Sequence, residues 1–141
     1  MPEAGGPPTE ALGRVDGAGF GPEKETRFVE ERFEVSQESG SGYALVSVVG
    51  EVDVATAPEL RDRLREAVAD GSPTVAVDLT EVTFIDSTAL GVLIETKKLC
   101  DGEGRTMRIA VSEPRILKVF EITGLTGLFD IRPTRDQAVA G

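Results

Sequence analysis

One segment constrains the fold more than any other, the apolar run from Thr74 to Leu79. It is short and rich in valine, and it lies between Pro73 and a polar turn, which is typical of a strand buried on both faces. Helical patterns come before and after it. A strand that alternates with helices indicates right-handed crossovers and therefore a parallel sheet.

The remaining segments fit the same alternation. Residues 32–36 alternate polar and apolar side chains as a half-exposed strand does, and residues 43–49 form a more apolar strand after a Gly/Ser turn. The patterns predict helices over 56–70, 87–100 and 112–123, the first from the four-residue steps of Leu60, Leu64 and Val68. They also predict strands over 106–111 and 129–131 and a small terminal helix. The expected fold is α/β, in the order β-β-α-β-α-β-α-β-α. Its sheet is mixed but largely parallel, with about five strands, the first antiparallel and at an edge.

Capping signals mark the starts of several predicted helices. Thr56 with Glu59 three residues later predicts a capping box, and Thr134 with Gln137 repeats the pattern at the terminal helix. Ser112 is the expected cap of the helix over 112–123. These signals locate the loops in which function gathers in a parallel sheet.

Composition excludes several classes of function. The chain has no histidine, so it lacks Ser-His-Asp and Cys-His catalysis and histidine zinc sites. Its single cysteine, Cys100, forms no intramolecular disulfide and is expected to be a passive thiol. We therefore expect no metal and no cofactor.

The net charge of −10 argues against nucleic acid or an anionic membrane surface as a partner. A basic protein surface suits the charge better, although solubility alone also explains it. The chain has no apolar stretch near the ~20 residues of a membrane span and no secretory signal at its start. The expected location is the cytoplasm.

Residues 1–28 are rich in Gly, Pro, Ala and Glu and show no apolar period. This composition is typical of a flexible acidic tail. The folded domain is expected over residues 29–141.

Candidate functional residues follow two strands that should be neighbours. Asp53 ends the Gly50-Glu51-Val52-Asp53 segment, and Asp86-Ser87-Thr88 follows the next strand. Because the carboxyl ends of parallel strands meet at one edge, we expect Asp53 and Ser87 to lie close together. Both aspartates also suit turns or caps. A Mg²⁺ or acid/base role lacks a third ligand or a base.

Ser87 has three interpretations. It is an ordinary N-cap hydroxyl, or a phosphate acceptor at a helix N-terminus, where free N–H groups and the dipole tolerate the added charge. A phosphate adds about −1.5 to −2 of charge. Beside Asp53 and Asp86 it would repel an acidic partner surface or clash sterically. A nucleophilic role would need Lys97, Lys98 or a carboxylate as base, and none has convincing spacing.

Several of these segments resemble the STAS domain of bacterial anti-sigma factor antagonists. The resemblance lies in Gly50–Asp53, Asp78–Thr80, the run Phe84-Ile85-Asp86-Ser87-Thr88-Ala89-Leu90-Gly91-Val92-Leu93, and Ile122–Leu125 with Phe129. It covers about residues 31–140. Ala89 stands where many members have glycine, at a helical position that alanine suits.

The resemblance implies a non-enzymatic switch. The unphosphorylated antagonist binds an anti-sigma factor that is also a GHKL-type serine kinase, and thereby releases the sigma factor. The kinase inactivates the antagonist by phosphorylating Ser87, and a PP2C-type phosphatase reactivates it. The implied partner-binding residues are Asp53, Asp86, Ser87, Thr88, Leu90 and Gly91. The sigma factor and the oligomeric state, monomer or weak dimer, stay open. A STAS scaffold or transport-complex subunit without phosphorylation is the alternative.

Overall fold

The computed structural model describes residues 33–140. The predicted tail over 1–28, and the predicted domain start at residue 29, lie outside the described residues. The elements run in the predicted order, with one additional 3-10 turn before the last strand.

Five strands form a single sheet in the order β1-β2-β3-β4-β5. β1 is antiparallel to β2 and lies at an edge, whereas all other neighbours are parallel. This confirms the predicted mixed, largely parallel sheet. The strands are β1 (Phe33–Gly40), β2 (Tyr43–Val52), β3 (Thr74–Ile85), β4 (Thr106–Ala110) and β5 (Asp130–Arg132).

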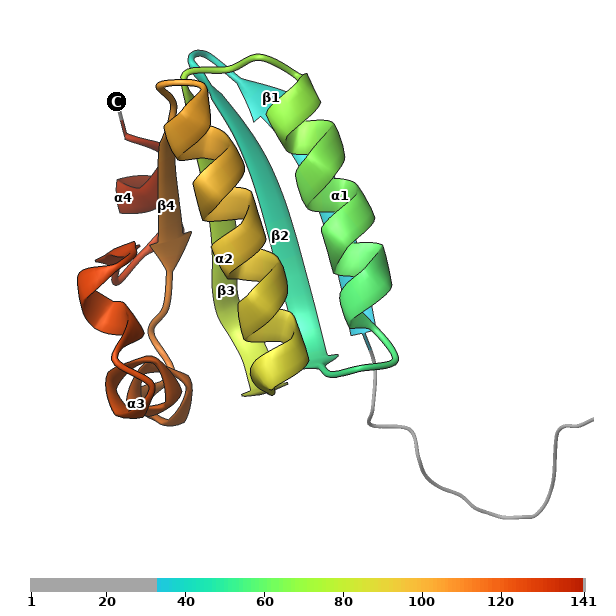
Figure 1. Ribbon diagram of the computed structural model, residues 1–141, viewed down its shortest axis with the longest axis vertical. Helices are drawn as coiled ribbons and strands as arrows, with labels where there is room; N and C mark the ends of the chain where they lie inside the picture. The colour runs from blue at the N-terminus through green and yellow to red at the C-terminus, as the bar shows by residue number, and fades with distance from the viewer. Residues whose placement is uncertain (1–32, 141) are drawn as a thin grey trace, which may run out of the picture. The chain divides into compact units, whose positions relative to one another are not determined.

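The helices divide between the two faces of the sheet. α1 and α2 lie side by side over one face (Figure 1), whereas α4 contributes Ala138 to a small cluster with Leu45, Ala76 and Ala110 on the other face. The helices are α1 (Ala57–Ala69), α2 (Ser87–Gly102), α3 (Pro114–Ile122), the 3-10 helix η1 (Leu125–Gly127) and α4 (Arg135–Val139). None of the helices in the described part of the chain is long and apolar enough to cross a membrane.

The main core lies between the sheet and the α1/α2 layer. Alternate residues of β2 point into it, among them Val46 and Val48, and α1 contributes Leu60 and Leu64 from one face. Both leucines are fully buried, and each such side chain stabilises the fold by about 2 kcal/mol. The four-residue spacing that predicted this helix face is therefore the spacing that builds the core.

β3 is longer than predicted, because the apolar run ends at Leu79 but the strand continues to Ile85. Its pairing with β2 shifts register twice, between Ser47 and Val49 and between Gly50 and Glu51, and β3 carries one extra residue at each shift. These bulges change the spacing of buried side chains from two residues to three. A search for alternating buried and exposed residues therefore ends the strand too early, where the bulges begin.

Two other helix starts test the predicted caps. α3 begins after Glu113 and not after Ser112, because the Glu113 carboxylate accepts the N–H of Arg115 at 3.1 Å. The predicted Ser112 cap is therefore wrong by one residue. The Thr134 cap is confirmed, since its hydroxyl accepts the N–H of Gln137 at 3.2 Å.

Candidate functional site

The carboxyl ends of β2 and β3 lie together at one edge of the sheet. Val52 pairs with Ile85, and the N–H of Asp86 donates to the Val52 carbonyl at 3.2 Å. The loop that leads to α1 and the first turn of α2 therefore start side by side, at the lower end of the sheet in Figure 1. The expected juxtaposition of the segments that carry Asp53 and Ser87 is present.

Asp53 shapes the loop between β2 and α1. Its Oδ1 accepts the N–H groups of Ala55 at 2.9 Å and Thr56 at 3.1 Å, which is an Asx-turn. The Thr56 hydroxyl accepts the N–H of Asp53 at 2.9 Å and donates to the Glu51 carbonyl at 3.1 Å. The predicted capping box is therefore wrong: Thr56 is the N-cap residue, but its hydroxyl turns back into the loop and caps no helical N–H.

α2 begins at Ser87 as predicted, but its N-cap is a different residue from the one expected. Asp86 is the N-cap, with extended backbone, and its Oδ1 accepts the N–H of Ala89 at 3.1 Å. The interpretation of Ser87 as an N-cap is thus wrong, because Ser87 is the first helical residue. The hydroxyls of Ser87 and Thr88 are exposed and have no hydrogen-bond partner among residues 33–140. Both project from the first turn, where backbone N–H groups lack intrahelical partners.

In the next turn of α2, a buried leucine is followed by an exposed glycine. Leu90 is only 6% exposed and belongs to the main core. Gly91 is exposed, and a Cβ added there would meet no atom within 4 Å. Since glycine lies four residues after Ser87, it continues the same helix face and leaves it flat.

The charge at this edge has one sign. β1, β2, β3, the loop to α1 and the first two turns of α2 contain no Lys or Arg. Where β2 and β3 end, they and their loops carry acidic side chains instead, namely Glu51, Asp53 and Asp86. No group of three or more His, Cys, Asp or Glu side chains in the described part of the chain could hold a metal ion.

The geometry gives no support to Ser87 as a nucleophile. Lys97 pairs with Asp101 at 2.8 Å, and it lies ten residues further along α2, about 15 Å from Ser87 by helical rise. Asp86 uses one carboxylate oxygen as a cap. Ser87 therefore has an exposed hydroxyl, and no residue in the described part of the chain is positioned as its base.

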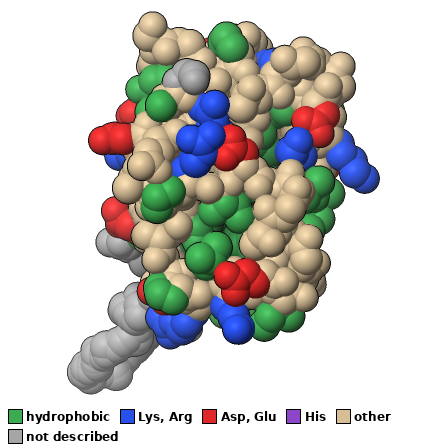
Figure 2. Space-filling model, turned by 90° about the vertical axis from the view of Figure 1, so that its left-hand side faces the viewer, with side chains coloured by type: hydrophobic (Ala, Val, Ile, Leu, Met, Phe, Trp, Pro, Cys, Tyr) green, Lys and Arg blue, Asp and Glu red, His purple; other side chains and the backbone are tan. Residues whose placement is uncertain are grey.

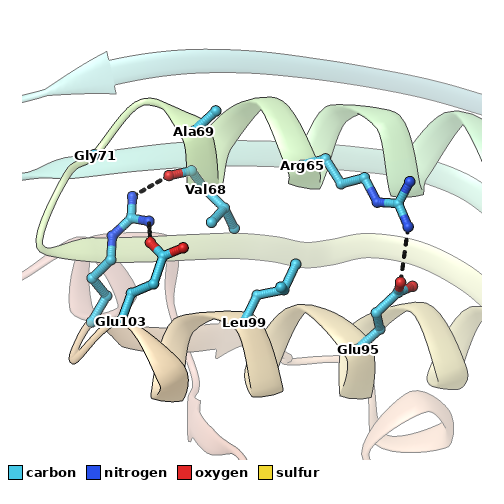
Figure 3. Close-up of a pocket in the computed structure, with 8 residues that line it drawn as sticks. Arg65, Val68, Ala69, Gly71, Glu95, Leu99 and Glu103 are labelled. Atoms are coloured by element: carbon cyan, nitrogen blue, oxygen red, sulfur yellow. Dashed lines mark hydrogen bonds and ion pairs between the residues drawn. The ribbon is translucent and has the colours of Figure 1, made fainter.

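One groove lies between α1 and α2, away from Ser87. It measures about 670 Å³ and is lined by Val68 and Leu99, with the ion pair of Arg65 and Glu95 at one end (Figure 3). Hydrogen bonds from Arg65, then Arg61, lower the pKa of Glu95. The charged side chains on the two walls of this groove are thus already paired with each other.

A second groove, of about 490 Å³, lies beside β5 and is lined by Leu117, Phe129 and Ile131. The view in Figure 2 shows this side of the molecule, where hydrophobic side chains gather in a hollow between charged ones. Neither groove includes Ser87 or Asp53.

Sequence comparisons relate this chain to anti-sigma-B factor antagonists. The chain is 35% identical over 86 residues to the anti-sigma-B factor antagonist of Bacillus subtilis (strain 168), covering 61% of this chain and 78% of the relative. It is 38% identical over 86 residues to the anti-sigma-B factor antagonist of Staphylococcus aureus (strain NCTC 8325 / PS 47), covering 61% and 80%.

Solved structures show the same fold. The crystal structure of an anti-sigma factor antagonist from Mycobacterium paratuberculosis superposes with a TM-score of 0.72 at 31% identity, covering 79% of this chain and 94% of that one. The unphosphorylated form of the antagonist SpoIIAA shares the fold, with a TM-score of 0.64 at 18% identity. The sequence model of the STAS domain matches residues 34–138, almost the whole of the described structure. The chain therefore belongs to the STAS domain family.

Proposed function

We propose that this chain is an anti-sigma factor antagonist whose binding is switched by phosphorylation of Ser87. In its unphosphorylated form it binds an anti-sigma factor that is also a GHKL-type serine kinase, and the sigma factor is released. The names of its relatives support the first part of this proposal. The geometry of the edge around Ser87 supports the second part.

One observation carries the proposal: the Ser87 hydroxyl is exposed and is not needed for the helix cap. Asp86 already caps α2 through the N–H of Ala89. A kinase can therefore transfer the γ-phosphoryl group of ATP to Ser87 Oγ, with loss of the hydroxyl proton and release of ADP, without removing a stabilising hydrogen bond. The unpaired N–H groups of the first turn also accommodate an anion.

The phosphate would act on the partner interface and not on the core. It adds about −1.5 to −2 of charge to an edge at which β2, β3 and the loops that follow them carry no Lys or Arg. It also fills space above the flat face that Gly91 leaves open. A doubly charged group in a packed interface costs desolvation and displaces the partner sterically.

The proposed contact surface consists of Asp53, Asp86, Ser87, Thr88 and Gly91. Leu90 is buried and supports this turn from beneath, so we do not include its side chain in the surface. A PP2C-type phosphatase would hydrolyse the phosphoserine and restore binding. A cytoplasmic location follows from the same proposal, because the sigma factor acts there.

Intact mass analysis after incubation with candidate anti-sigma kinases and ATP tests the proposal. We expect one added phosphate on the wild-type chain and none on Ser87→Ala. Thr88→Ala is the control, since its hydroxyl is equally exposed, and it should still gain one phosphate. If the chain binds a partner but no kinase modifies Ser87, the scaffold or transport-complex alternative replaces the switch.

A further inference from the structure

We propose that Val54 is the apolar anchor through which this edge recognises its protein partner, and that the partner presents a small hydrophobic socket with a basic rim. The inference rests on the proposed function, because Val54 lies on the same edge as Ser87. It adds the chemistry that the partner's contact surface must have.

Val54 is unusual because it is both exposed and rigidly held. It is 70% exposed, although it sits between Asp53 and Ala55, which the Asx-turn fixes. The backbone bonds from Thr56 and Ala57 to the Asp53 carbonyl close the same loop, at 3.2 and 2.8 Å. A side chain presented by a preorganised loop loses little conformational entropy on binding, which is the property of a binding anchor.

A second apolar side chain reaches the surface at the same edge. Phe84 is 47% exposed and pairs with Glu51, just after the second register shift in β3. The second register shift lengthens the spacing between the buried Val82 and Ile85 to three residues, so that Thr83 and Phe84 between them are both exposed. Val54 and Phe84 are thus presented by two separate backbone irregularities on neighbouring strands.

The charge around these apolar side chains specifies the rim of the partner. Glu51, Asp53 and Asp86 surround the ends of β2 and β3, and these strands and their loops carry no Lys or Arg. A partner with an acidic rim would be repelled, whereas Lys or Arg side chains would find unpaired carboxylate oxygens. The second oxygen of Asp53 and that of Asp86 have no partner in the described part of the chain.

A protein surface suits this edge better than a small molecule. The α1–α2 groove and the β5 groove include no residue of the edge, and Val54, which is 70% exposed, lines neither of them. A projecting aliphatic side chain beside a flat glycine face fits a concave surface on a larger partner. The occupant is therefore a folded protein, and under the proposed function it is the anti-sigma kinase.

The test is a calorimetric titration of an anti-sigma kinase that phosphorylates the wild-type chain on Ser87. Val54→Ala should weaken the affinity of the chain for the kinase about tenfold, because it removes two carbon groups that the interface would bury. The melting temperature should not change, because the side chain is exposed in the free chain. Leu99→Ala is the matched control: Leu99 is 40% exposed but lies twelve residues along α2 from Ser87, about 18 Å away by helical rise. The affinity of the Leu99→Ala chain for the kinase should equal that of the wild type.

The charge of the rim is tested separately by salt. Association of the wild-type chain with the kinase should slow about tenfold between 50 and 500 mM NaCl, because steering by opposite charges is screened. Equal affinities for Val54→Ala and wild type would overturn the anchor, and a salt-independent rate would overturn the basic rim. If no anti-sigma kinase binds or phosphorylates the wild type, the proposed function itself fails, and the inference fails with it.

Discussion

Gly91 offers a perturbation in which stability and binding should change in opposite directions. It is the fifth residue of α2 and lies in the helix interior, where glycine costs about 1 kcal/mol relative to alanine. A Cβ at this position would meet no atom of the protein within 4 Å, so Gly91→Ala introduces no clash. We therefore expect the free energy of unfolding to rise by about 1 kcal/mol.

The magnitude can be measured by urea denaturation. With a slope of about 2 kcal/mol per molar for a domain of this size, the midpoint should rise by about 0.5 M, and the melting temperature by about 4 °C. Gly102→Ala is the matched control, because Gly102 is also helical, exposed and free of atoms within 4 Å of an added Cβ. It should stabilise less, since it is the last residue of α2.

Binding separates the two glycines. In the proposed surface Gly91 lets the partner approach the backbone of α2, so Gly91→Ala should weaken the complex while it stabilises the free chain. Gly102→Ala should leave the affinity unchanged. A Gly91→Ala chain that is no more stable than wild type would refute the helix argument. One that is more stable and binds equally well would refute the role of Gly91 in docking.

Three further predictions follow from single contacts. Asp86→Ala removes the cap on Ala89 and should lower the free energy of unfolding by about 1 kcal/mol in urea denaturation; an unchanged midpoint would show that the cap adds nothing. Hydrogen bonds from Arg132 lower the pKa of Asp130, so its stabilisation is present at neutral pH and lost as the pH falls through the lowered value. Asp130→Asn should therefore flatten the acid limb of a stability-versus-pH curve, and a parallel curve would contradict this. Burial raises the pKa of the Cys100 thiol, so a disulfide reagent at pH 8 should label it slowly in the folded chain and rapidly in urea; equal rates would show that the thiol is accessible.

Much of the fold could be predicted because hydrophobic periodicity survives wherever an element packs on one face. The four-residue spacing of Leu60 and Leu64 predicted α1, and the valine run from Thr74 predicted the buried part of β3. The end of β3 could not be predicted, because bulges displace the alternation beyond Leu79. Pairing with a neighbouring strand, which no local pattern encodes, holds that extension in place.

Caps were harder to place because several adjacent residues have suitable side chains. Asp86 and Ser87 both cap helices well, and only the extended backbone at Asp86 decides between them. Thr56 matched a capping box, but the neighbouring Asp53 competed for its hydroxyl. A short-range signal gives the location of a helix start, and the tertiary path of the chain selects the residue.

Gly50 has a backbone conformation that the sequence pattern did not predict. Its φ of +101° lies in the region that favours glycine, and it sits at the second register shift between β2 and β3. The Gly-Glu-Val-Asp segment thus combines a bulge, a core valine and the aspartate that forms the Asx-turn. A glycine before a strand end, followed by Asp-x-x-Thr, is the signal that could have identified this loop.

The two aspartates at the edge together explain how the proposed switch can leave the core unchanged. Asp53 directs one oxygen to the loop and Asp86 directs one oxygen to the helix, so both carboxylates serve first to fix the backbone. Each keeps a second oxygen that carries charge to the surface, and no side chain among residues 33–140 accepts a hydrogen bond from Ser87. A rigid, acidic edge with an exposed hydroxyl can register one added phosphate as a large change in what it binds, and its core need not move for that change to take effect.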